Sequence, residues 1–262
     1  MAPEKARLQN FYKHDDDTKV ITIFVHGYGN ADSDSQTHIM HLVRMTNIDY
    51  NAYLFRWPSG TVVTSVIKGA QKGAVVGARL GSKVAGAKGA VIGAVVGGAT
   101  GGVVGIGGSY FINRAKCEDY SEQLYQRVRR IPNIMEYTID LVGHSLGAFM
   151  VFNSLQSSRR GWSTLPIRNV VLMGAAFSSG QSSTPWYDAL ELLSGKMFNV
   201  WSDSDMVLTF EPNLKTRIGK SKVLIRNDKF RNIKMRNYGH SDYWKRYQTV
   251  YNATILKSLT VN

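Results

Sequence analysis

The sequence is poor in cysteine, with Cys117 alone in 262 residues. One cysteine cannot form an internal disulfide, so the chain is not a disulfide-stabilised scaffold and fits folding in a reducing compartment. Residues 1–19 also lack the apolar run that a Sec-type signal peptide requires. We therefore expect a cytoplasmic or peripheral membrane protein, although delivery by a specialised secretion route would look the same.

Acidic residues are also few. The chain has 32 Lys and Arg against 19 Asp and Glu, a net charge of +13, and none of its acidic residues lies between Asp49 and Glu118. This balance favours a polyanionic partner, either an anionic lipid surface or nucleic acid. Because the sequence contains no recognisable nucleic-acid-binding motif, we expect an anionic membrane surface and disfavour nucleic acid.

Short apolar runs alternate with helical patterns along much of the chain. The patterns predict strands over residues 19–27, 51–57, 137–143, 167–177, 196–202 and 232–239. They predict helices over residues 34–46, 117–131, 146–158, 186–194 and 242–259. Such an alternation is typical of an α/β fold with a doubly wound, mostly parallel sheet, here in a single domain over residues 1–262.

The stretch LVGHSLGAF places Ser145 in a G-x-S-x-G motif, between His144 and Leu146. The motif falls between a predicted buried strand and a predicted helix, which is where a nucleophile elbow forms. Gly143 and Gly147 supply the small residues that let strand and helix approach each other. We therefore predict that Ser145 is a catalytic nucleophile.

A serine nucleophile needs a histidine base and an acid that orients the base. On this scaffold the expected chain order is serine, acid, histidine, and only His240 follows Ser145. The acid should follow a strand between them, where FNVWSDSDMVL offers two candidates. We favour Asp205, which precedes a hydrophobic anchor, and keep Asp203 as the alternative acid.

The stretch VHGYGN after the first predicted strand resembles the loop that supplies an oxyanion-hole donor. We expect the backbone N–H groups of Tyr28 and Leu146 to bind the oxyanion. In this reading His26 orients the loop and does not act as a base.

No metal and no organic cofactor are expected. His38 and His41 lie near Asp32 and Asp34, but their spacing lacks a third fixed ligand. An ordinary helix face is the preferred interpretation.

Four stretches in this order, VITIFVHGYGN, LVGHSLGA, NVWSDSDMVL and GHSDYW, resemble the α/β-hydrolase superfamily. The last two are similar to the branch that contains transmembrane and coiled-coil domain hydrolases. The resemblance covers nearly all of residues 19–258 except the glycine-rich tetrad block, and it implies an esterase or lipase with the triad Ser145, Asp205 and His240. The chain departs from the usual pattern because its early antiparallel strands are shortened or missing, and because a glycine-rich insertion replaces a helix.

The insertion, residues 66–113, is built of tetrads that open with glycine or alanine. A four-residue repeat of small residues lets helices approach closely, and residues 89–113 carry no charge over a length that could span a bilayer. We therefore predict a membrane-engaging helical hairpin. A hairpin packed on the hydrolase and a flexible linker are the alternatives.

Two further segments bear on substrate access. Residues 178–195 lie where such folds place a lid or cap, and their Trp and Leu residues would line an acyl pocket or form an ordinary core face. The basic run 215–236 would bind phosphate headgroups or remain a solvated face.

The predicted function is hydrolysis of carboxylic esters of lipids, by a lipase or phospholipase, at a membrane surface. A soluble esterase or thioesterase would use the same triad and is the first alternative. The second is non-catalytic, a membrane-inserting toxin or interaction protein on a hydrolase scaffold.

Overall fold

The computed structural model describes residues 6–14, 17–28, 33–46, 50–59, 114–178, 183–209 and 217–257. The chain divides into two compact units, one of residues 1–27, 33–58 and 117–262 and the other of residues 28–32 and 59–116. The glycine-rich segment 66–113 belongs to the second unit and lies outside the described residues, so the predicted hairpin stays a prediction.

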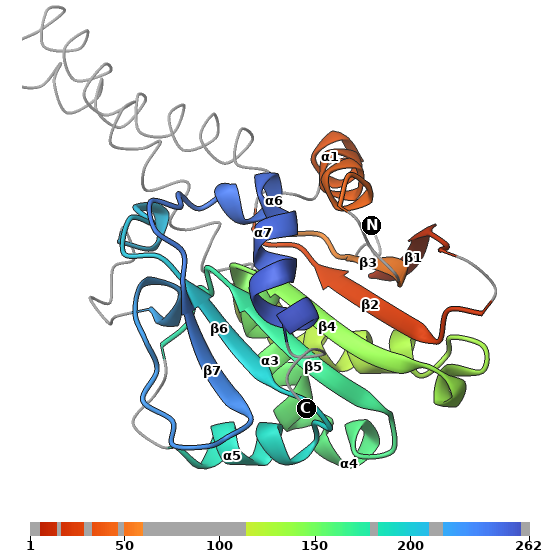
Figure 1. Cartoon of the computed structure of the whole chain (residues 1–262). Coiled ribbons are helices and arrows are strands. Elements are labelled where there is room, and N and C mark those ends of the chain that lie inside the picture. The colour runs from red at the N-terminus through yellow and green to blue at the C-terminus, as the bar shows by residue number, and fades with distance from the viewer. Residues whose placement is uncertain are drawn as a thin grey trace, which may run out of the picture. The chain divides into compact units, whose positions relative to one another are not determined.

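Within the described residues, a seven-stranded sheet forms the centre of the first unit, in the order β1-β3-β2-β4-β5-β6-β7 (Figure 1). Every neighbouring pair is parallel except β1 and β3, so the sheet is mostly parallel, as predicted. The strands are β1 (Arg7–Tyr12), β2 (Val20–Val25), β3 (Asn51–Arg56), β4 (Thr138–His144), β5 (Ile167–Met173), β6 (Met197–Trp201) and β7 (Phe230–Lys234).

Helices cover both faces of this sheet (Figure 1). One face carries α1 (Ser33–Arg44), α6 (Asp242–Lys245) and α7 (Tyr247–Tyr251), which continues into a π-helical turn, Asn252–Leu256. The other carries the helical residues 114–128, α3 (Leu146–Ser157), α4 (Arg159–Trp162) and α5 (Thr184–Glu191). Short 3₁₀ helices occupy connections at Ile134–Glu136, Val207–Thr209 and Ile218–Lys220.

The central strands are apolar on both sides because both of their faces are covered. On one face Phe24 of β2 contacts Trp244 and Tyr247, with ring centroids 6.1 and 5.3 Å apart. On the other face Phe152 of α3 packs on Trp186 of α5 at a centroid distance of 4.3 Å. The contacts of Phe24 hold α6 and α7 on the sheet, and the contact between Phe152 and Trp186 joins α3 to α5.

Several elements differ from the sequence-based prediction. β5 ends at Met173, although the predicted strand runs to residue 177, and the short helix α4 was not predicted. An antiparallel strand, β1, precedes the first predicted one, so the early antiparallel part is shortened but present. β7 ends at Lys234, and the predicted residues that follow it pack as a turn in which Met235 and Tyr238 are buried. The predicted terminal helix is interrupted at Arg246, whose φ of −119° and ψ of 34° separate α6 from α7.

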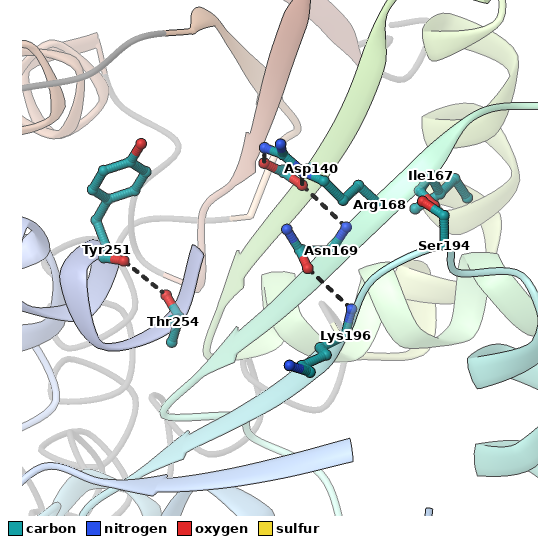
Figure 2. A network of polar contacts seen from close by, with 8 residues as sticks. All are labelled: Asp140, Ile167, Arg168, Asn169, Ser194, Lys196, Tyr251 and Thr254. Atoms are coloured by element: carbon teal, nitrogen blue, oxygen red, sulfur yellow. Dashed lines mark hydrogen bonds and ion pairs between the residues drawn. The ribbon is translucent and has the colours of Figure 1, made fainter. Parts of the chain in front are cut away.

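A buried ion pair holds β4 against β5 near their amino ends (Figure 2). The register shifts between Ile139 and Asp140, so Arg168 becomes an extra residue in β5. The Asp140 carboxylate accepts hydrogen bonds from Arg168 Nε at 3.1 Å, from Arg168 Nη2 at 2.5 Å and from the Asn169 backbone N–H at 3.0 Å. Burial raises the pKa of Asp140, and the Arg168 guanidinium opposes this effect.

The substitution Arg168→Met is expected to lower the free energy of unfolding by about 3–5 kcal/mol, because it leaves a buried carboxylate without its cation. The folded chain would then bind a proton on Asp140 more readily than the unfolded chain. The loss should therefore shrink as the pH is lowered from neutrality towards the unfolded pKa of Asp140. Urea unfolding at several pH values measures both effects.

Arg159→Met is the matched control for that change. Arg159 is partly exposed and pairs with Asp188 and Glu191 on the surface, so its loss should cost less than about 1 kcal/mol. Equal losses in the two variants, or a loss in Arg168→Met that does not change with pH, would contradict the account given for Asp140.

Candidate active site

Ser145 occupies the sharp turn between β4 and α3. Its φ of 57° and ψ of −121° lie in a region that side chains other than glycine rarely adopt. The turn is held by β5 and the chain after it, because the Ser145 N–H donates to Met173 O at 3.0 Å and its carbonyl accepts from the Ala176 N–H at 3.2 Å. The surrounding backbone thus maintains a strained conformation, as nucleophile elbows require.

The glycines on either side of the elbow are required by close packing. A Cβ atom on Gly147 would lie 2.2 Å from the Val25 carbonyl oxygen at the end of β2. A Cβ on Gly143 would lie 2.6 Å from the backbone of α3. Both neighbours are backbone atoms that cannot move aside cheaply. Strand and helix can therefore meet at this angle only because both positions are glycine.

Asp205 and His240 lie together at the same edge of the sheet, after β6 and β7. His240 Nδ1 is 2.8 Å from Asp205 Oδ2, and the Asp205 side chain is fully buried. A carboxylate only accepts, so Nδ1 carries the proton and the Nε2 lone pair is available as a base. His240 lies beside the elbow, because its carbonyl oxygen is 2.7 Å from His144 Nε2.

Asp203, the alternative acid, lies elsewhere. Its side chain is 58% exposed and forms an ion pair with Lys234 at 2.6 Å. The hydrogen bond from Lys234 lowers the pKa of Asp203. Of the two candidate acids, the structure therefore brings Asp205 to His240 and leaves Asp203 at the surface.

The two predicted oxyanion donors, Leu146 and Tyr28, belong to different units of the chain. Leu146 is the first residue of α3, so its N–H has no acceptor within the helix. Tyr28 belongs to the second unit, and its role stays a prediction. The residue before it, Gly27, lies against Ser145, since a Cβ there would be 2.7 Å from Ser145 Cβ.

His26 is buried and bonds to the chain around it, in keeping with its predicted role in orienting this loop. Its Nε2 is 3.4 Å from the Trp57 N–H, and its Nδ1 is 3.0 Å from the Gly27 carbonyl oxygen. The C=O and N–H of one trans peptide point in opposite directions. The bond to Gly27 therefore also sets the direction of the Tyr28 N–H.

Gly174, which follows β5, is a site residue that was not predicted from the sequence. Its φ is 47°, and a Cβ there would lie 2.8 Å from the Tyr243 ring and 3.2 Å from Asp205 Oδ2. A side chain at this position would therefore disturb the acid. The sequence does carry a signal, because an isolated glycine inside a predicted strand, here 167–177, indicates a bulge or a close approach of the backbone.

The segment predicted as a lid contains α5, which packs against α3 through the buried Trp186. Its last residues lie at the amino end of β5, where the Ser194 N–H donates to Ile167 O at 2.9 Å. Residues 179–182 lie outside the described residues, and a lid there stays a prediction.

Neither a metal cluster nor a membrane-spanning helix occurs in the part of the chain that the structure describes. No group of three or more His, Cys, Asp or Glu side chains is placed to hold a metal ion there. His38 and His41 are exposed on α1. The helices within those same ranges are too short or too polar to cross a bilayer.

Comparison with solved structures finds similar folds at very low sequence identity. A lipase-esterase related protein from Clostridium acetobutylicum ATCC 824 is 11% identical with a TM-score of 0.50, over 96% of this chain and 99% of that chain. A dienelactone hydrolase-like promiscuous phosphotriesterase, P91, from metagenomic libraries is 8% identical with a TM-score of 0.50, over 97% and 98% of the two chains. At this level of identity, these likenesses show the fold alone.

Comparison with the curated proteins gave no match. The model of one protein family, described as "Alpha/beta hydrolase of unknown function (DUF900)", matches residues 2–190. This match covers well over half of the chain and includes the elbow. The chain therefore belongs to this family of α/β hydrolases.

Proposed function

We propose that the chain is a serine hydrolase that cleaves carboxylic esters of lipids at a membrane surface. The observation that carries the proposal is the buried Asp205 carboxylate bound to His240 Nδ1, beside the strained elbow that presents Ser145. This is the combination of nucleophile, base and orienting acid that acyl transfer requires.

In the proposed reaction, Ser145 Oγ attacks the ester carbonyl carbon while His240 Nε2 accepts the hydroxyl proton. The negative charge moves to the carbonyl oxygen, which the N–H of Leu146 and the predicted N–H of Tyr28 stabilise. Asp205 stabilises the imidazolium and keeps its Nδ1 proton in place.

Collapse of the tetrahedral intermediate breaks the bond to the alcohol, which leaves with the proton from His240 Nε2. The acyl group then remains on Ser145 Oγ. A water molecule gives a proton to His240 and attacks the acyl carbon, and the second collapse releases the acid and returns the proton to Ser145. The proposed chemistry uses these side chains, the two backbone N–H groups and water.

Two features support a lipid surface as the place of reaction. Met206 and Val207, each 58% exposed, directly follow Asp205 at the edge of the sheet that carries the site. Large apolar side chains exposed beside a site are a frequent mark of contact with lipid or protein. The net charge of +13 favours an anionic membrane.

The test is hydrolysis of p-nitrophenyl esters from acetate to palmitate, below and above the concentration at which each ester aggregates. We expect kcat/KM to rise with acyl length and the rate to increase further on aggregated substrate. Activity confined to short esters would leave a soluble esterase. A wild-type chain without activity on any ester would overturn the proposal and favour the membrane-inserting alternative.

The apolar pair can be tested in the same assay. The double variant Met206→Ser/Val207→Ser should lose activity on aggregated esters and keep its activity on dissolved acetate. Met135→Ser is the matched control, because Met135 is 62% exposed but precedes the amino end of β4, at the opposite end of the sheet. Equal behaviour of the two variants would refute a role for the pair in surface contact.

A further inference from the structure

His144 joins the nucleophile elbow to the loop that carries the base. It is the last residue of β4 and directly precedes Ser145. Its Nε2 lies 2.7 Å from the carbonyl oxygen of His240, a residue 96 positions away in the sequence. The two imidazole rings also contact each other, with centroids 4.7 Å apart and planes at 44°.

The chemistry of this contact fixes where the proton of His144 lies. A carbonyl oxygen can only accept a hydrogen bond, so Nε2 must carry a hydrogen and donate. Nδ1 is then unprotonated, and it is buried without a partner among the described residues. Burial lowers the pKa of His144 well below its usual value, and the nearby charge of His240 lowers it further. His144 therefore stays a neutral donor.

The His144 ring itself is held firmly. Tyr243 and Trp244 of α6 pack against it, with centroid distances of 5.8 and 5.6 Å, and the residue is buried. Its backbone pairs with Met173 of β5 in the centre of the sheet. The donor is thus attached to a buried central strand of the sheet, which makes it a suitable anchor for a neighbouring loop.

His240 lies in the turn between β7 and α6, and bonds between Gly239 and Asp242 hold that turn locally. The His240 ring is bound through its Nδ1 to Asp205. The bond from His144 to the His240 main chain supplies a second fixed point, on the same turn that positions Ser145.

We propose that His144 is a positioning residue, whose Nε2–H holds the main chain of His240 so that the imidazole of His240 is directed at Ser145. The inference rests on the proposed function, since it assigns His240 as the base. It gives His144 a role in positioning the base, in addition to its place in the turn between β4 and α3.

The test compares two substitutions of this residue. His144→Phe keeps an aromatic ring but has no donor, whereas the amide of His144→Gln can donate to the same carbonyl. With dissolved p-nitrophenyl acetate, we expect kcat/KM to fall about 10²-fold in His144→Phe, as for a misplaced catalytic group. His144→Gln should recover most of this loss. His41→Phe, on the exposed face of α1, is the matched control and should leave kcat/KM unchanged.

A second readout does not depend on substrate. The proton on His240 Nδ1, bound to Asp205, should give a low-field ¹H NMR signal that is shifted or broadened in His144→Phe and restored in His144→Gln. If the wild-type chain hydrolyses no ester, the proposed function fails and this signal alone decides the role of His144.

Two results would overturn the inference. One is a His144→Phe variant that keeps both the rate and the low-field signal of the wild type. The other is a His144→Gln variant as impaired as His144→Phe, which would mean that the shape of the ring matters and the hydrogen bond does not. Should His144→Phe fail to fold, His144→Met, which also lacks a donor, takes its place under the same criteria.

Discussion

Replacing Ser145 by alanine is expected to lower kcat for ester hydrolysis by about 10⁶-fold, the loss seen when a triad serine is removed. The substitution removes the only atom that forms the covalent bond to the acyl group in the proposed mechanism. His240 and Asp205 cannot compensate, because a base without its nucleophile can only activate water from a poorly placed position. The measurement is the rate on the ester series described above.

The fold of this variant should be preserved. The strain at Ser145 is held by main-chain bonds to Met173 and Ala176, which alanine keeps. Ser157→Ala, at the exposed end of α3, is the matched control and should show the wild-type rate. A Ser145→Ala chain that retained wild-type hydrolysis would refute the catalytic assignment. If the wild type and Ser145→Ala had the same biological effect, that would favour action through membrane insertion.

Asp205→Asn is expected to lower kcat by about 10⁴-fold with little change in stability, as observed when a triad acid becomes an amide. The asparagine side chain has nearly the same shape, but its oxygen carries no charge to stabilise the imidazolium. Its NH₂ group would also favour the tautomer of His240 that has the proton on Nε2, where it cannot accept the proton of Ser145.

Asp203→Asn provides an internal control two residues away. The Asp203 carboxylate is exposed and bound to Lys234, so its loss should leave kcat unchanged and cost less than about 1 kcal/mol of stability. Measuring kcat for both variants therefore decides which of the two candidate acids, Asp203 or Asp205, takes part in the reaction. A larger loss in Asp203→Asn than in Asp205→Asn would reverse the assignment.

The sequence predicted the parallel sheet and the position of the elbow because both depend on local patterns. β4 is a short strand rich in Ile, Leu and Val, and Ser145 lies between two glycines at its end, so strand, turn and helix follow from neighbouring residues. The choice between Asp203 and Asp205 could not follow from spacing, because it depends on which side chain is buried against a loop from another part of the chain.

The elements that differed from prediction have weak local signals. β1 is the outermost strand of the sheet, and Phe11 is its only buried residue. Its sequence therefore shows little alternation of apolar and polar residues. β7 ends just before Met235 and Tyr238, which are buried in the turn that follows but resemble a continuing strand when their sequence is taken alone. The contact from His144 to His240 joins segments too far apart for any sequence pattern to reveal.

The length of chain between β2 and β4 has a consequence for how the molecule folds. β4, β5, β6 and β7 follow one another in both chain and sheet, whereas β2 pairs with β4 across the long connection that contains residues 59–116. Doubling the length of a flexible loop adds only about 0.6 kcal/mol of closure entropy. A large insertion here is thus thermodynamically mild, but it raises contact order and slows folding. We expect the β4–β7 half to form first and to provide the surface on which the amino-terminal strands then assemble.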